Sequence, residues 1–127
     1  MSAVVAVADQ GYSTLRPGRV LTILADVEAY PRWWPEVRAP RPGRLRVPGI
    51  GEVDVRVDGL RPDVGLYLRL SGARLEGHLE WYLEPFEEGT VVNCITNIRA
   101  SGRWSPRRTL RVRAAVRRAM VALREAS

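Results

Sequence analysis

The sequence is poor in the residues that most often carry chemistry. It has one cysteine, Cys94, one histidine, His78, and no lysine, so all 20 basic residues are arginines. A single cysteine excludes an internal disulfide and is typical of a reducing compartment. A zinc site needs three or four histidine, cysteine or carboxylate ligands. We therefore expect no metal site, and no motif indicates a cofactor.

Long hydrophobic runs are also missing. No apolar stretch approaches the ~20 residues that span a bilayer, and the apolar N-terminus lacks a basic leader. The 127 residues are 46% hydrophobic and 27% charged, which is typical of a globular protein. We expect a single domain over residues 1–127 of a bacterial, cytoplasmic protein.

Positive charge is in excess, with a formal net charge of +6. This excess favours an anionic partner such as nucleic acid or a membrane surface. A GC-rich genome also enriches arginine, and arginines on the outer side of a helix keep that side solvated. A ribosome- or nucleic-acid-associated role therefore stays open as one alternative.

The first part of the chain predicts a strand followed by two short helices. Residues 4–8 and 12–15 suggest one extended segment, interrupted near Gly11. Pro17 suits the first turn of a helix, and apolar residues then recur at helical spacing. A second helix from Tyr30 to Trp34 must stop at Pro35, because proline disfavours helix in the residue before it.

The middle of the chain alternates between apolar and polar residues, which predicts antiparallel strands with one buried face. His78 shares the polar face with Glu76 and Glu80. A last strand is expected over residues 90–100. The positions expected to face inward are Val53, Val55, Val57, Leu66, Leu68, Leu70, Leu75, Leu79, Trp81, Leu83, Val92, Cys94, Thr96, Ile98 and Ala100.

The C-terminal segment predicts one long amphipathic helix. Ser105 is a candidate N-cap, and Pro106 fits the first helical position of a helix over residues 106–126, about 31 Å long. The sheet has one apolar face and the helix has one apolar stripe, and each must be buried against another element. We therefore predict an α+β fold in which a curved antiparallel sheet wraps around this helix. Its apolar stripe comprises Val112, Val116, Ala119, Met120 and Leu123.

Three motifs occur in the order found in one large family. The START-like polyketide cyclase/dehydrase (SRPBCC) proteins have a helix–helix signature that resembles "RVLTILADVEAYPRWWPEVR". Their hairpin resembles "GARLEGHLEWYLEPFEEGTVV", and the last motif is "NIRASGRW", which precedes an arginine-rich helix. The resemblance implies the helix-grip fold with a hydrophobic cavity between the sheet and the long helix. It covers lipid carriers, plant-allergen-like binders, polyketide cyclases and ribosome-associated relatives, so it does not imply one activity.

The inward positions favour binding over catalysis. Only Cys94 and Thr96 among them are even weakly polar, so we expect no catalytic residue. We predict binding, and possibly transport, of a small hydrophobic molecule that is lipid-, polyketide- or quinone-like. A core filled by its own side chains and a polyketide aromatase/cyclase-like enzyme stay open as alternatives. The predicted binding residues are Trp33, Trp34, Val55, Leu68, Leu79, Trp81, Cys94, Thr96, Ile98, Val116 and Met120.

Two adjacent tryptophans, Trp33 and Trp34, stand between Pro31 and Pro35. Successive helical residues diverge by about 100°, so the two rings should not point the same way. We expect one ring to be buried as an anchor and the other to lie at the mouth of the cavity.

Overall fold

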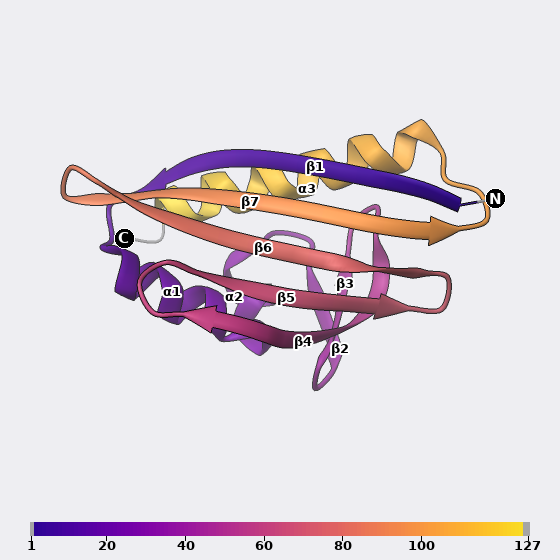
Figure 1. The fold of residues 1–127 in the computed structure, drawn as a ribbon, viewed down its shortest axis with the longest axis horizontal. Coiled ribbons are helices and arrows are strands. Elements are labelled where there is room, and N and C mark those ends of the chain that lie inside the picture. The colour runs from indigo at the N-terminus through magenta and orange to yellow at the C-terminus, as the bar shows by residue number, and fades with distance from the viewer. Residues whose placement is uncertain (1, 126–127) are drawn as a thin grey trace.

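A computed structural model describes residues 2–125 and contains one seven-stranded antiparallel sheet with a long C-terminal helix (Figure 1). The strand order is β1-β7-β6-β5-β4-β3-β2. The predicted α+β architecture is thereby confirmed. In chain order the elements are β1 (Ser2–Ser13), α1 (Pro17–Ala25), the 3₁₀ turn η1 (Val27–Ala29), α2 (Tyr30–Trp33), β2 (Arg38–Arg41), β3 (Arg44–Val47), β4 (Gly51–Arg61), β5 (Gly65–Gly72), β6 (Leu75–Phe86), β7 (Gly89–Ser101) and α3 (Pro106–Glu125).

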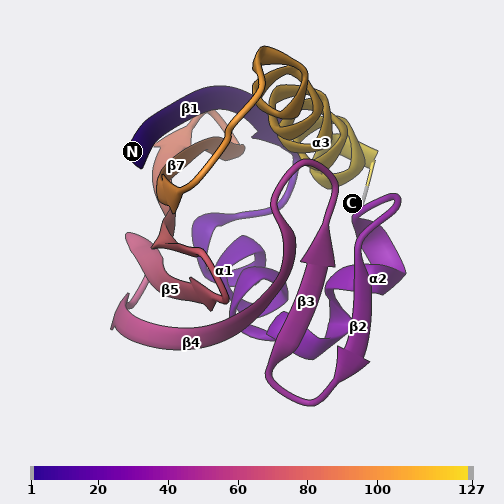
Figure 2. The ribbon, with the colours of Figure 1, turned by 90° about the vertical axis from the view of Figure 1, so that its right-hand side faces the viewer.

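The sheet curls into a half-barrel, and α3 lies across its open side (Figure 2). Glycines permit tight curvature within the strands. A Cβ at Gly77 would overlap the backbone oxygen of Asn97 in the neighbouring strand, and a Cβ at Gly65 would overlap that of Trp81. Only glycine tolerates such close approach of two backbones. Helices α1 and α2 lie at the end of the half-barrel opposite the start of α3.

The predicted alternation of inward- and outward-facing side chains is confirmed along β5, β6 and β7. Every position expected to face inward on these strands is buried, while Arg69 and Arg99 on the opposite parity are exposed. The prediction is wrong for Val57 on β4, which is 45% exposed although its partner Leu68 is buried. The pairing register shifts between Val57 and Gly59, and no helix of residues 2–125 packs closely over β4. The concave side is therefore uncovered there.

The predicted break in the first strand is wrong. β1 pairs with β7 in unbroken register from Ser2 to Ser13. Gly11 stays in the strand because α3 packs against it: a Cβ there would lie 2.9 Å from Met120 Cβ. The glycine thus marks a close strand–helix approach, and not a turn.

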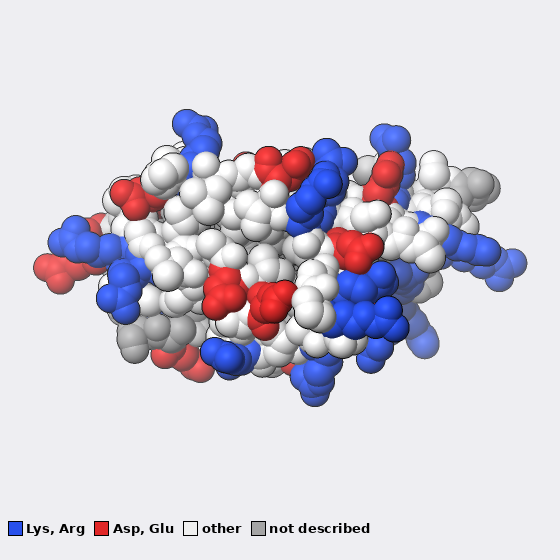
Figure 3. All heavy atoms as spheres, turned by 90° about the horizontal axis from the view of Figure 1, so that it is seen from below, with Lys and Arg blue, Asp and Glu red and all other residues white. Residues whose placement is uncertain are grey.

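The hairpin of β2 and β3 has no counterpart in the sequence-based prediction. Prolines and arginines dominate it, and only Leu45 and Val47 are buried. Seen from below, arginine side chains gather toward the side of the molecule where this hairpin lies, with acidic groups interspersed (Figure 3). Arg44 and Arg46 both pair with Glu52 of β4, at 3.1 and 3.4 Å.

Helix α3 is fixed at several points along its length. Ser105 caps it as predicted, because the Arg108 backbone N–H donates to Ser105 Oγ at 3.3 Å. Arg108 Nε and Nη2 donate to the backbone oxygens of Gly49 and Ile50, at 3.0 and 3.2 Å.

Arg117, further along α3, forms a two-pronged ion pair with Asp9 of β1, which lowers the pKa of that carboxyl group. The predicted apolar stripe is buried, together with Ala115.

The outer face of α3 carries the arginines, as expected, together with two exposed apolar side chains, Leu110 and Val121. Its arginines are exposed, apart from Arg108, which is half-buried. Among residues 2–125, no helix is both long enough and apolar enough to cross a membrane. Ala126, which the prediction included in the helix, lies outside the described residues.

Replacing Gly11 with alanine tests the contact between β1 and α3. The new Cβ would crowd Met120, so the helix must move away from the strand. We expect the free energy of unfolding, measured by urea denaturation, to fall by about 1–3 kcal/mol. Gly59→Ala is the matched control, because its Cβ would meet only Tyr67 Cβ, at 3.6 Å. A loss no larger for Gly11→Ala than for the control would contradict this packing.

Candidate functional site

Four aromatic rings form the centre of the interior. Trp33 and Trp34 come from the end of α2, Tyr30 from its start and Trp81 from β6. Their ring centroids lie 5.1–6.4 Å apart, mostly edge to face. We call these four residues the aromatic cluster. It occupies the space between the sheet and α3, where the resemblance implied a cavity.

The tryptophan pair departs from its expected geometry. The two rings stack, with centroids 5.7 Å apart and planes 20° apart, and do not diverge. The reason is Pro35: it keeps Trp34 out of the helix, with φ −95° and ψ 107°, so α2 ends at Trp33. The expected difference in burial is nevertheless present, because Trp34 is 1% exposed and Trp33 is only partly buried.

Tyr30 is the residue at this site that sequence reasoning missed. It is fully buried, and its hydroxyl donates to Leu24 O at 2.6 Å while accepting from Trp81 Nε1 at 3.0 Å. Burial raises the pKa of Tyr30 well above its usual value. The phenol thus links α1 to β6 and stays neutral. The "AYP" sequence before the tryptophans was the available signal.

One buried polar atom of the cluster has no partner. Trp34 Nε1 donates to the backbone oxygen of Ala115 in α3 at 2.8 Å, and Trp81 Nε1 donates to Tyr30. Trp33 Nε1 is buried and meets no acceptor among the described residues. A buried N–H without an acceptor costs about 1–3 kcal/mol, so this donor is available for an incoming group.

Cys94 and Thr96 are the weakly polar groups of the sheet's inner face. Cys94 Sγ lies 3.9 Å from Thr96 Oγ1, and both side chains are buried. Burial raises the pKa of Cys94 to about 12, so the thiol is protonated at neutral pH. A protonated, enclosed thiol is a poor nucleophile and a poor metal ligand.

The predicted binding residues all lie on the interior side of the molecule. Trp33 and Val55 keep partial exposure and pack against the core. Whether any of these side chains touches a ligand stays a prediction. Those that are buried are Trp34, Leu68, Leu79, Trp81, Cys94, Thr96, Ile98, Val116 and Met120.

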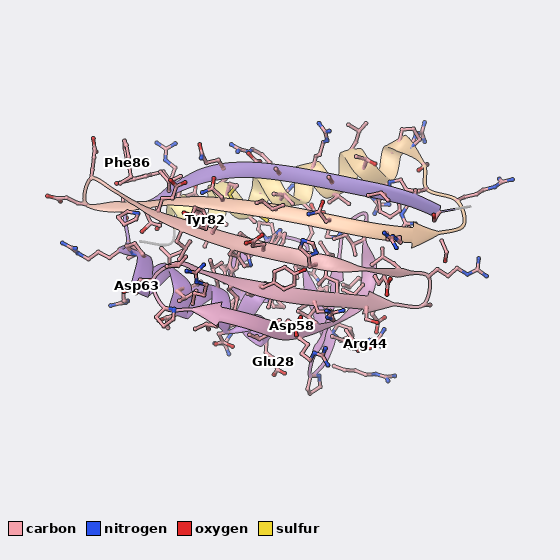
Figure 4. The ribbon with its side chains drawn as sticks, in the orientation of Figure 1. Glu28, Arg44, Asp58, Asp63, Tyr82 and Phe86 are labelled. Atoms are coloured by element: carbon pink, nitrogen blue, oxygen red, sulfur yellow. The ribbon has the colours of Figure 1, made fainter. Side chains whose placement is uncertain are left out.

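His78 faces outward, as expected. Its ring stacks on Tyr67 at 4.6 Å, and its Nε2 lies 3.2 Å from Asn97 Nδ2. These residues border a hollow of about 340 Å³ on the convex face of the sheet. Figure 4 shows other outward residues, among them Tyr82 on β6 and Asp58 on β4, whose carboxylate pairs with Arg69 at 3.3 Å. Among residues 2–125, no three histidine, cysteine or acidic side chains group as a metal site.

Comparison with known proteins identifies the fold through solved structures, whereas the sequence comparisons find no match. No family model matches the sequence, and no curated protein matches it. The chain is similar in structure to a START superfamily protein from Mycobacterium smegmatis, with 16% identity, 94% of each chain covered and a TM-score of 0.70.

Two further solved structures have the same fold. The di-domain ARO/CYC StfQ of the steffimycin biosynthetic pathway has 14% identity and a TM-score of 0.66, with 96% of this chain and 50% of that chain covered. Ara h 8.0201 has 13% identity and a TM-score of 0.65, with 97% of each chain covered. The predicted START-like helix-grip fold is therefore confirmed.

The buried thiol predicts a loss of stability in alkaline solution. The pKa of Cys94 is about 12 in the folded chain against an ordinary 9.0. Above about pH 9 the unfolded chain therefore releases a proton that the folded chain keeps, and the free energy of unfolding should fall by up to about 1.4 kcal/mol per pH unit. Cys94→Ala should remove this fall between about pH 9 and about pH 10, as measured by urea denaturation.

Tyr30→Phe is the control for the alkaline experiment. The tyrosine pKa is also raised, from 10.0, so most of its contribution comes above that pH. The Phe variant should keep the fall between about pH 9 and about pH 10. An unchanged slope in Cys94→Ala would show that the thiol is not held neutral by the fold.

Proposed function

We propose that this protein binds a small hydrophobic molecule on the concave side of the half-barrel, against Trp33. The unpaired indole N–H of Trp33 is the observation that carries the proposal. In the same cluster, the polar atoms of Tyr30, Trp34 and Trp81 all have hydrogen-bond partners. The other polar atoms of the cluster already have hydrogen-bond partners, so the Trp33 N–H is the donor that an acceptor atom of a ligand can satisfy.

Access to the interior is supported by the uncovered half of β4. Val57 faces the concave side yet is 45% exposed, and Val55 is partly buried. We propose that an apolar ligand approaches the partly exposed ring of Trp33 from this side and leaves Trp34, which is anchored to α3, in place. The space is limited by the aromatic cluster, so we expect a molecule smaller than a two-chain lipid.

The chemistry of the interior defines the class of ligand. Its walls are apolar, and its titratable groups among the described residues, Tyr30 and Cys94, are both kept neutral by burial. General acid–base catalysis needs a group that titrates near neutral pH. We therefore propose a binding or carrier role for a flat, neutral molecule with at least one carbonyl or ether oxygen, such as a polyketide- or quinone-like compound. We propose that the protein acts in the cytoplasm.

Substitution of each tryptophan by phenylalanine tests the role of the free donor. Trp33→Phe keeps an aromatic ring but removes the N–H, so the affinity for prodan, a neutral naphthyl ketone dye, should fall about fivefold with little change in stability. Trp34→Phe removes the bond to Ala115 O and should lower the free energy of unfolding by about 1–3 kcal/mol. Dye fluorescence and urea denaturation measure the two effects.

His78→Ala is the control for binding, because this side chain lies on the convex face. It should leave the affinity for prodan unchanged. Absence of saturable dye binding to the unmodified protein would overturn the proposed function. Equal loss of affinity in the two tryptophan variants would show that the Trp33 N–H is not the ligand's partner.

A further inference from the structure

One end of the half-barrel carries a hollow that is separate from the aromatic cluster. Its volume is about 630 Å³, and it lies where the β3–β4 turn, the β5–β6 turn and the link from β7 to α3 meet. Figure 2 looks onto this end of the molecule. Nothing in the proposed function uses it.

The floor of this hollow is apolar. It is formed by side chains that belong to the core and are at most 9% exposed. A ligand in the hollow would therefore rest part of its surface on a dry, rigid base. The floor residues are Ile50, Val53, Leu75 and Ala100.

The rim of the hollow is formed by arginines. Arg74 comes from the β5–β6 turn, Arg103 from the link before α3 and Arg108 from the first turns of α3. The turn is joined to the end of β7 by the Ser101 N–H, which donates to Arg74 O at 2.9 Å. A methyl group at Gly102 would lie 3.8 Å from Arg74 Nη1, so the guanidinium of Arg74 is directed toward the link.

The positive charge of the rim is not neutralised within the described residues. Arg74 and Arg103 form no ion pair there, and both are exposed. Arg108 donates to two backbone oxygens and lies 4.0 Å above the ring of Trp104, contacts that leave its full charge in place. The carboxylate on the wall, Glu52, is engaged by Arg44 and Arg46.

The start of α3 adds to this positive potential. The first turn of a helix favours acidic residues, because its free N–H groups carry partial positive charge. Here that turn has no acidic residue and carries Arg107 and Arg108 instead. Like charges gathered around one hollow repel each other, and an anion placed between them relieves that repulsion.

We propose that this hollow binds an amphipathic oxyanion, a carboxylate or phosphate that bears a short apolar group. The guanidinium groups of Arg74 and Arg103 would hold the oxyanion, for which the arginine fork is well shaped. The apolar group would lie on the floor at Val53 and Leu75. This inference does not depend on ligand binding at Trp33.

Titrations followed by NMR of the isotope-labelled full chain test this site directly. The probes are octyl phosphate, octanoate, 1-octanol and inorganic phosphate, and the signals are the Nε–Hε groups of Arg74 and Arg103 and the indole N–H of Trp33. We expect the two octyl anions to shift the arginine signals. Octanol should leave them unchanged, and inorganic phosphate should bind more weakly than octyl phosphate.

A pair of charge-matched variants makes the test specific. Arg74→Gln with Arg103→Gln should weaken octyl phosphate binding about tenfold. Arg113→Gln with Arg124→Gln removes the same charge from α3 outside the hollow and should change the affinity less than twofold. Added salt should weaken the binding of both octyl anions.

Three results would overturn the proposal. A shift of the arginine signals by octanol as large as that by octanoate would show that the anion is irrelevant. An equal loss of affinity in the two double variants would show that only net charge matters. Binding of inorganic phosphate as tight as that of octyl phosphate would show that the apolar floor contributes nothing. Shifts of the Trp33 signal report on the interior and test the other proposal separately.

Discussion

The structure depends on one packing constraint, the covering of the inner face of a curled sheet by its helices. Helix α3 packs along β1 and helix α1 packs over β5, β6 and β7, and the apolar stripe of α3 is buried in the interior that they enclose. Burial of each large apolar side chain is worth about 1.5–3 kcal/mol, so the stripe from Val112 to Leu123 is a major part of the stability. The curl of the sheet at Gly77 and the close approach at Gly11 both serve this contact.

The aromatic cluster follows from the same constraint. Closing the half-barrel brings α2 under α3, and the bond from Trp34 to Ala115 O fixes that position. Three polar groups of the cluster are then used to join elements distant in sequence, while Trp33 Nε1 is not. Because its neighbours are held in place, the ring of Trp33 is pre-oriented, which reduces the entropy lost on binding.

Local patterns predicted much of the fold, and tertiary contacts decided the rest. Alternation located the inner faces of β5, β6 and β7, since a strand's period of two is a property of its own backbone. The role of Gly11 could not be read locally, because it depends on Met120, more than a hundred residues away. The stacking of Trp33 on Trp34 was missed because Pro35 shortens α2 by one residue, which changes the direction of the second ring.

The two proposed sites are close enough to be occupied by parts of one molecule. Arg108 and Ala115 are seven residues apart on α3, which corresponds to about 10 Å at 1.5 Å per residue. Ala115 accepts the bond from Trp34, on which Trp33 stacks, whereas Arg108 borders the arginine-lined hollow. An apolar chain of about eight carbons covers such a distance. Val112, which lies between these two residues on α3, and Val53 on the floor of the hollow are both buried in the core. A molecule that used both sites would have to displace them, so its binding should cost packing energy that ligands of either single site avoid.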